Sequence, residues 1–333
     1  RISFGGGGTD LTHYYWEKGG AVINATVALY SRALLRKRND MRVKIRSADL
    51  SIEASAEDIE AFCQTPEKLG LIASLLHLIS PRFGFDLEIT SDFPVGSGLG
   101  GSSVVLAAII GCFNEFRMDR WDRYEMAEMA FQAERLHLNM AGGWQDQYAT
   151  VFGGFNFIEF DSRQNVVHPI RLDSAVECEL EESLILCHTG QGHESGEIHA
   201  EQKEAMQSSQ GISELVDENK RLTYEMKNLL LRGRLLDFGR ALDRAWALKR
   251  RFSSRISNIG IDRIYDIARA NGAIGGKLLG AGGGGYFLFY ALPGQIADLR
   301  KALLQSGYDS ERVRFEDRGL HSWTVRQQRI QGG

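Results

Sequence analysis

The sequence has few cysteines and no long apolar run. The four cysteines, Cys63, Cys112, Cys178 and Cys187, include no pair at C-x-x-C spacing. Four could form two bridges, but in a 333-residue chain of this type we predict buried free thiols. The most apolar stretch, Val104–Gly111, is far shorter than the about 20 residues that a membrane-spanning helix needs. No signal peptide opens the chain, which starts at Arg1 rather than Met, and we expect a short segment to precede it. These absences predict a cytoplasmic protein that does not bind membranes.

An excess of basic residues is also absent. Lys and Arg number 39 against 43 Asp and Glu, which gives a formal net charge of -4. Proteins that bind nucleic acid through counterion release usually carry a basic surplus. We therefore expect no nucleic-acid partner. With 43% hydrophobic residues the chain has ample material for a packed core.

Proline is scarce and glycine is abundant, at 5 Pro against 37 Gly. The glycines gather in three runs, at Gly5–Gly8, Gly96–Gly101 and Gly275–Gly285. Glycine at such density is costly in chain entropy and is expected where the backbone comes close to a ligand or adopts positive φ. The three runs therefore mark the predicted functional regions.

Apolar periodicity indicates an α+β fold with two domains. In the first half we expect strands at residues 21–30, 33–46 (with a turn at Asn39-Asp40), 85–89 and 152–160, and helices at 67–79, 102–116 and from 119 or 122 to 138. In the second half we expect a strand at 184–187, helices over 195–270, strands at 277–279 and 286–290, a helix at 295–305 and a strand at 313–315. This order of strands and helices in the second half is that of a ferredoxin-like unit. A boundary near residues 175–185 divides the chain into domains 1–180 and 181–333.

The middle glycine run leads directly into an apolar helix. Its sequence is Pro94-Val95-Gly96-Ser97-Gly98-Leu99-Gly100-Gly101-Ser102-Ser103. Such a loop lets backbone N–H groups surround an oxyanion, and the helix N-terminus adds unpaired donors and the positive end of a dipole. Ser102 and Ser103 occupy N-cap positions and could also reach a phosphate-bound metal ion. The pattern predicts a phosphate-binding loop.

Two common nucleotide-binding motifs are excluded at these runs. Gly96, Gly98 and Gly101 satisfy G-x-G-x-x-G, but a helix follows where a Rossmann unit needs a second parallel strand, which argues against a dehydrogenase. A Walker A loop is absent because Leu278 follows Gly276-Lys277.

Two acidic residues stand out after this loop. On the helix ending at 138, the stripe Glu125, Glu128, Gln132 and Arg135 is expected to face water. Glu134 instead interrupts an apolar stripe, where a carboxylate is costly unless it is paired or binds a metal. Asp146 follows twelve residues later in a glycine turn, where it could simply form the turn or cap a helix.

The first and third runs favour contact with a sugar or a phosphate. The first closes a short strand and continues into Thr9-Asp10, and an aspartate on a rigid loop can accept hydrogen bonds from two neighbouring hydroxyls. The third, Gly280–Gly285, is too long for a two-residue hairpin, so close backbone approach to a ligand explains it better.

Together these segments resemble motifs one, two and three of the GHMP small-molecule kinases. The Arg nine residues before Asp10, the P-x-G-x-G-L-G-x-S-S loop and the G-A-G-G-G-G loop carry the resemblance over nearly the whole chain. Asp146-Gln147 resembles the galactokinase-like branch. Within that branch the segments GGGGTD, GSGLGGSS, GGWQDQYA and GAGGGGY most resemble the bacterial D-glycero-D-manno-heptose 7-phosphate kinases. The implied fold is an N-terminal domain like the second domain of ribosomal protein S5, followed by a ferredoxin-like domain.

The resemblance also implies the cofactors and a role for each site residue. The substrates would be ATP, with Mg²⁺, and a small sugar or sugar phosphate. Asp146 would accept the proton of the attacking hydroxyl or orient it, and Arg1 would stabilise the developing charge. ATP would be bound by Pro94, Gly96, Gly98, Leu99, Gly100, Gly101, Ser102 and Ser103, and the metal by Ser103 and Glu134. The sugar would be bound by Gly8, Thr9, Asp10 and Gly143, with Gly282, Gly283 and Gly284 closing over it or over the phosphates.

The resemblance implies an ATP-dependent kinase that phosphorylates the anomeric hydroxyl of D-glycero-D-manno-heptose 7-phosphate, on the route to GDP-heptose, and this is the leading hypothesis for the acceptor. A substrate that already carries a phosphate needs a cationic pocket, and the resemblance leads us to expect an arginine where His193 stands. The runs Lys249-Arg250-Arg251 and Arg36-Lys37-Arg38 could supply cations, but each is more typical of a solvated surface. The alternatives are a kinase for unphosphorylated fucose or galactose, and a catalytically dead relative that binds sugar and nucleotide. Neither the oligomeric state nor the anomer is predicted.

Overall fold

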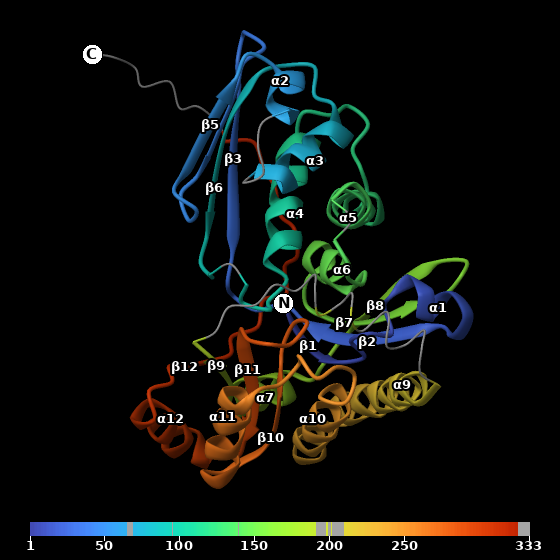
Figure 1. Cartoon of the computed structure of the whole chain (residues 1–333), viewed down its shortest axis with the longest axis vertical. Helices are drawn as coiled ribbons and strands as arrows, with labels where there is room; N and C mark the ends of the chain where they lie inside the picture. The colour runs from blue at the N-terminus through green and yellow to red at the C-terminus, as the bar shows by residue number, and fades with distance from the viewer. Residues whose placement is uncertain are drawn as a thin grey trace.

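The computed structural model describes residues 1–64, 69–94, 96–138, 140–190, 198, 201 and 210–325. Its elements form three four-stranded sheets with helices between and around them (Figure 1). In chain order they are β1 (Ile2–Gly5), α1 (Thr12–Lys18), β2 (Gly20–Ala25), β3 (Ser31–Lys37), β4 (Val43–Ser47), β5 (Ile52–Ala56), α2 (Ile59–Cys63), α3 (Gly70–Ile79), β6 (Phe85–Ser91), α4 (Gly101–Asn114), α5 (Arg123–Phe131), the π-helical turn η2 (Gln132–His137), α6 (Gln145–Phe152), β7 (Phe155–Phe160), β8 (Asn165–Ile170), α7 (Ser174–Ser183), β9 (Leu184–His188), α9 (Gln210–Leu231), α10 (Leu235–Lys249), α11 (Ile259–Ala270), β10 (Ala273–Leu278), β11 (Tyr286–Ala291), the 3-10 turn η3 (Pro293–Gln295), α12 (Ile296–Gln305) and β12 (Ser310–Arg312).

The N-terminal half holds two sheets. One has the order β3-β6-β4-β5, and its strands alternate buried and more exposed residues, so only one face is packed. Helices α2, α3 and α4 lie against that face (Figure 1), and their core includes Leu87, Leu106 and Phe113. The other sheet, β1-β2-β7-β8, runs across the middle of the molecule, with α6 on one side and α9 on the other (Figure 1).

The C-terminal half confirms the ferredoxin-like prediction. Its sheet has the order β10-β11-β9-β12 with every neighbouring pair antiparallel. The apolar strands β9 and β11 are central, and Trp246 and Phe238 of α10 are buried with them in one core. The fold is therefore α+β, as the periodicity predicts.

Some sequence-based boundaries differ from the structure. The last strand is β12 rather than residues 313–315, because those residues turn back towards the N-terminal half. There Phe315 pairs with Val27, and the Leu320 amide donates to Val151 O at 3.2 Å. The helix expected to run to 138 is regular only as α5, and η2 continues it with π geometry. Helices α1, α2, α6 and α7 and strands β5 and β8 were not predicted from the sequence.

The C-terminal segment thus packs on the N-terminal half, and the division at residue 180 stays a prediction. Within the described residues, no helix combines the length and the apolarity that crossing a membrane requires.

Candidate active site

The three glycine runs meet at one cavity of about 900 Å³. The second and third runs touch through their backbones. A Cβ on Gly280 would lie 2.6 Å from Gly98 Cα, and the Tyr286 amide donates to Ser97 O at 3.1 Å. Side chains at these glycines would push the two loops apart. The glycine density predicted that the backbone comes close to a ligand. In the structure, part of this glycine content instead lets the second and third loops contact each other.

The N-terminus of α4 points into this cavity. Gly96, Gly98, Gly100, Gly101 and Ser102 line it. The N-cap is Gly100, with φ of 79°, and no side chain caps the helix. The predicted N-cap role of Ser102 and Ser103 is therefore wrong. Their hydroxyls bond to Glu134 instead, which leaves the first amides of α4 open towards the cavity.

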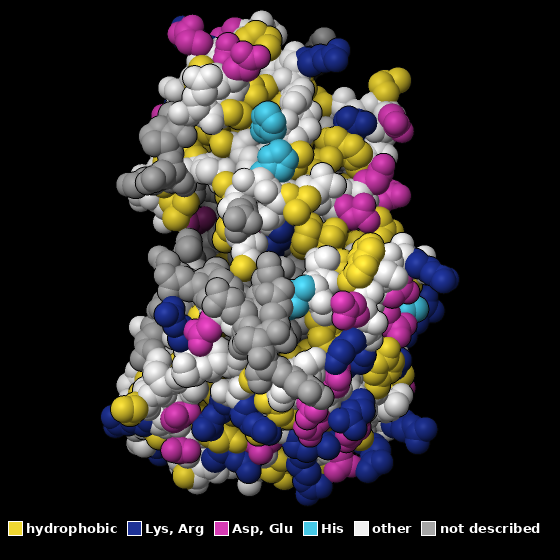
Figure 2. Space-filling view, turned by 45° about the vertical axis from the view of Figure 1, so that its right-hand side comes forward, with side chains coloured by type: hydrophobic (Ala, Val, Ile, Leu, Met, Phe, Trp, Pro, Cys, Tyr) yellow, Lys and Arg dark blue, Asp and Glu magenta, His cyan; other side chains and the backbone are white. Residues whose placement is uncertain are grey.

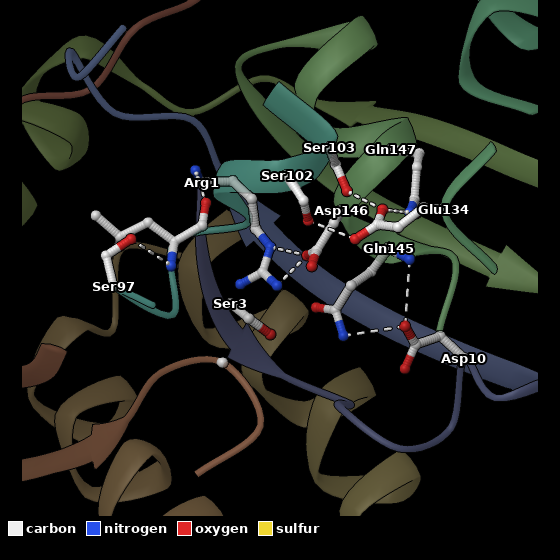
Figure 3. A network of polar contacts seen from close by, with 12 residues as sticks. Arg1, Ser3, Asp10, Ser97, Ser102, Ser103, Glu134, Gln145, Asp146 and Gln147 are labelled. Carbon is white, nitrogen blue, oxygen red and sulfur yellow. Dashed lines mark hydrogen bonds and ion pairs between the residues drawn. The ribbon is translucent and has the colours of Figure 1, made fainter. Parts of the chain in front are cut away.

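Glu134 is the centre of a buried polar network (Figure 3). Its side chain is 1% exposed. Oε1 accepts a hydrogen bond from Ser102, and Oε2 accepts bonds from Ser103 Oγ at 2.9 Å and Gln147 Nε2 at 2.7 Å. Arg135 Nη2 lies 3.5 Å from Oε1. The π-helical turn η2 carries both residues, and such turns occur frequently at functional sites.

Asp146 and Arg1 form an ion pair at the centre of the cavity (Figure 3). Asp146 lies in the first turn of α6, and Arg1 begins the segment that becomes β1. Burial alone would raise the pKa of Asp146, but the positive charges of Arg1 and Arg135 hold it below its ordinary value. The carboxylate is therefore ionised at neutral pH and faces the N-terminus of α4 across Gly100, where a Cβ would lie 3.3 Å from Asp146 Cγ.

Asp10 forms a second carboxylate position, beside the glycine turn at 142–143. Its Oδ2 accepts hydrogen bonds from the amide of Gln145 at 3.2 Å and from Gln145 Nε2 at 3.1 Å, and Oδ1 accepts one from the Gly8 amide at 3.1 Å. Burial raises its pKa, although these bonds oppose the shift. A Cβ on Gly143 would overlap the Asp10 carboxylate, so only glycine fits there.

Several predicted residues lie behind the cavity wall rather than in it. Ser103 is fully buried on Glu134, and Leu99 is buried with its carbonyl accepting a hydrogen bond from the backbone nitrogen of Arg1 at 2.9 Å. Thr9 Oγ1 is taken up by Gly6 O and Ala21 O, both at 2.8 Å. It therefore braces the first loop, and no free hydroxyl is left for a sugar.

Pro94 is exposed and lies outside the cavity lining. The third loop contributes Gly280 and Ala281 to the lining, whereas Gly282, Gly283 and Gly284 do not contribute. Gly282 packs on Ile256, and the Gly283 amide donates to Ile256 O at 3.0 Å.

Sequence analysis assigned no role in the site to several polar residues of the lining, among them Ser3, Arg135, Gln145, Asn219 and Lys277. Arg135 was expected to face water, but its side chain is only 10% exposed, because η2 shifts the helical register. The run Lys249-Arg250-Arg251 was left open as a source of cations, although a solvated surface was the more typical interpretation. Lys249 lines the cavity, and Arg250 and Arg251 are exposed. Arg36 and Lys37 end β3 and Arg38 follows it, all outside the lining, and His193 lies outside the described residues.

Figure 2 shows basic and acidic side chains interspersed over the lower part of the face in view. The absence of a nucleic-acid partner stays a prediction.

Comparison with known proteins agrees with this geometry. Residues 60–154 match the family model of the GHMP kinases N terminal domain, and residues 226–309 match that of the GHMP kinases C terminal. The chain is 35% identical over 332 residues to the D-glycero-alpha-D-manno-heptose 7-phosphate kinase of Campylobacter jejuni, covering 98% of this chain and 97% of the relative. It is 25% identical to the L-fucokinase/L-fucose-1-P guanylyltransferase of Bacteroides fragilis, covering 96% of this chain and 37% of that protein.

A solved structure is similar over the whole chain. The crystal structure described as a D-glycero-D-manno-heptose 1-phosphate kinase from Bacteriodes thetaiotaomicron superposes with a TM-score of 0.81 at 27% identity, covering 98% of this chain and 97% of that one. Two matching domain models, a full-length relative and a shared fold lead to one conclusion: the chain belongs to the GHMP kinase family.

Proposed function

We propose that this kinase transfers the γ-phosphate of Mg-ATP to the anomeric hydroxyl of D-glycero-D-manno-heptose 7-phosphate, in the biosynthesis of nucleotide-activated heptose in the cytoplasm. The observation that carries the proposal is the position of the Asp146–Arg1 pair, between the N-terminus of α4 and the Asp10 loop in one cavity. The choice of sugar is supported by the 35% identical relative.

The second glycine loop is suited to the phosphates of ATP. Among the described residues no side chain caps the start of α4, and a helix N-terminus attracts anions through its unpaired amides and its dipole. Beyond this loop the cavity continues between α3 and the β3-β6-β4-β5 sheet, where its lining is largely apolar and suited to the base: Leu50, Leu69, Leu71, Ile72, Ile89 and Phe93.

The oxygen atoms around Glu134 fit a magnesium ion. Mg²⁺ prefers oxygen ligands and is commonly bound through one or two carboxylates together with substrate phosphates. Glu134 and the hydroxyl of Ser102 line the cavity and would supply such a set at the start of α4, while Ser103 holds Glu134 in place from behind. Within the described residues no group of three or more His, Cys, Asp or Glu side chains could hold a metal by itself, so the phosphates would complete the site. When bound, the ion neutralises charge on the β- and γ-phosphates.

The acceptor sugar would lie between Asp10 and Asp146. Asp10 accepts hydrogen bonds from ring hydroxyls and holds the sugar in one orientation. Asp146 orients the anomeric hydroxyl and takes its proton as the new P–O bond forms, while Arg1 stabilises the charge that develops on the transferred group. Phosphoryl transfer depends chiefly on such positioning and charge neutralisation.

A substrate panel tests the proposal. ADP release would be measured with Mg-ATP and heptose 7-phosphate, mannose 6-phosphate, fucose, galactose, mannose or no sugar. We expect turnover with heptose 7-phosphate and none without sugar. Turnover only with fucose or galactose would overturn heptose 7-phosphate as the acceptor but leave the proposed role of Asp146 in place. No turnover with any sugar of the panel would favour a relative that binds sugar and nucleotide without catalysis.

A further inference from the structure

Two lysines of the C-terminal half line the cavity. Lys277 lies on β10 and is 5% exposed, and Lys249, half-buried, ends α10. Lys249 Nζ donates to Leu278 O at 2.9 Å and Gly280 O at 2.7 Å, and Lys277 Nζ donates to Ser3 O at 2.8 Å. Among the described residues, no acidic side chain forms an ion pair with either ammonium group.

These bonds do not use all the donors. An ammonium group has three N–H donors, so Lys249 and Lys277 both keep N–H groups beyond their carbonyl partners. Ser3, whose carbonyl Lys277 binds, also lines the cavity, and its buried Oγ has no hydrogen-bond partner in the part of the chain that the structure describes. Buried cations are ordinarily paired. A wall that presents two unpaired ammonium groups and an unused hydroxyl is suited to an anion.

The other cations of the cavity have carboxylate partners. Arg1 pairs with Asp146, and Arg135 pairs with Glu134. Burial, followed by the charge of Arg1, lowers the pKa of Lys277 to about 7. Burial and the charges of Lys277 and Arg1 lower the pKa of Lys249 well below its ordinary value. The three cations therefore lie close enough to repel one another, and a bound dianion would offset that repulsion.

We infer that Lys249, Lys277 and Ser3 form a subsite for a phosphate monoester, namely the phosphate that the acceptor sugar already carries. We assign the subsite to the acceptor because the N-terminus of α4 supplies its own donors for the phosphates of ATP. Lys249 also binds the carbonyl of Gly280, which touches Gly98 of the second glycine loop, so the kinetic test must separate the two substrates. The inference rests on the proposed function and names the residues that would distinguish a phosphorylated from an unphosphorylated sugar.

Kinetics of Lys249→Met and Lys277→Met test the subsite. The control is Lys301→Met, the same change at an exposed position of α12. Losing one charge-assisted hydrogen bond to phosphate should raise KM for heptose 7-phosphate about 10- to 100-fold. KM for ATP should stay within about threefold, and the preference for heptose 7-phosphate over unphosphorylated heptose should fall by the same factor. A raised KM for ATP with an unchanged KM for the sugar phosphate would overturn the inference, because the lysines would then hold the nucleotide.

A binding measurement separates this inference from the proposed function. Inorganic phosphate would be titrated calorimetrically into the full chain saturated with ADP and Mg²⁺, so that the N-terminus of α4 is already occupied. The inference predicts binding that both variants lose and Lys301→Met keeps, whether or not the chain turns over heptose 7-phosphate. Equal phosphate binding by all the proteins would contradict it. Thermal unfolding checks the fold: Lys277→Met should unfold at a higher temperature than the wild type, because it removes a buried, unpaired charge. A lower unfolding temperature would show that Lys277 only braces Ser3.

Discussion

Gln147 Nε2 donates a hydrogen bond of 2.7 Å to Glu134 Oε2, and the next residue towards the N-terminus of α6 is Asp146. Through this bond, the helix that carries the proposed base also orients the proposed metal ligand. The two carboxylates are twelve residues apart in the sequence, and both lie beside the start of α4: Glu134 accepts a hydrogen bond from Ser103, and Asp146 faces Gly100. Their separate roles can be tested one at a time.

Replacing Asp146 by Asn should abolish most of the turnover. The change keeps the size of the side chain and removes the ionised oxygen that would take the proton, so we expect kcat to fall about 10²- to 10⁴-fold. Steady-state ADP release measures the loss, and a thermal unfolding curve shows whether the variant stays folded. A variant that retained most of its turnover would rule out the role of Asp146 as a base and leave only orientation.

Replacing Glu134 by Gln should weaken the use of magnesium. The amide keeps the shape of the side chain but loses the charge that would attract the ion. We expect the Mg²⁺ concentration for half-maximal rate to rise at least about tenfold, the order of one lost charge-assisted contact. Glu179→Gln, at an exposed position of α7, is the matched control. An unchanged Mg²⁺ dependence in Glu134→Gln would show that Glu134 does not bind the ion and serves only to hold its hydrogen-bond partners in place.

Gly143→Ala should affect the sugar and spare the nucleotide. The added methyl group overlaps the Asp10 carboxylate and would displace it from the cavity wall. We expect KM for the sugar phosphate to rise about tenfold or more, the order of one lost hydrogen bond to a charged group, with little change in KM for ATP. Gly294→Ala, where a Cβ meets nothing within 4 Å, controls for the general effect of the substitution. Equal effects on both substrates would contradict the placement of the sugar beside Asp10.

The pH dependence should report the Arg1–Asp146 pair. Arg1 and Arg135 hold the pKa of Asp146 below its ordinary value against the effect of burial. An acid with a lowered pKa keeps its ionised form down to lower pH, so the acidic limb of kcat/KM due to Asp146 should lie below the pH range of an ordinary aspartate in the wild type. In Arg1→Met, only Arg135 remains to oppose the effect of burial on the pKa of Asp146. The pKa should therefore rise, and the acidic limb of kcat/KM should move to higher pH. A limb at the same pH in both proteins would show that another group controls it.

The sequence by itself determined the elements whose cause is local. The three glycine loops stand out because close backbone approach and positive φ require glycine wherever they occur. Period-2 and period-3.6 apolar patterns predicted the α+β class and the ferredoxin-like half, because one buried face requires those spacings. Asp146, Glu134 and Arg1 were identified together, and the structure places all three in one cavity.

Only the tertiary structure decided which polar groups face the cavity. The composition of the run Lys249-Arg250-Arg251 is that of a solvated surface, yet Lys249 lies in the cavity because α10 ends there. Arg135 was assigned to the water-facing stripe of a regular helix, and the π-helical turn brings it inward. Thr9 was expected to meet the sugar, but β2 takes its hydroxyl. Whether each of these side chains faces the cavity depends on contacts between segments distant in sequence, or on a local change of helical register. Burial and charge pairing follow from this tertiary packing and cannot be read from the residue type.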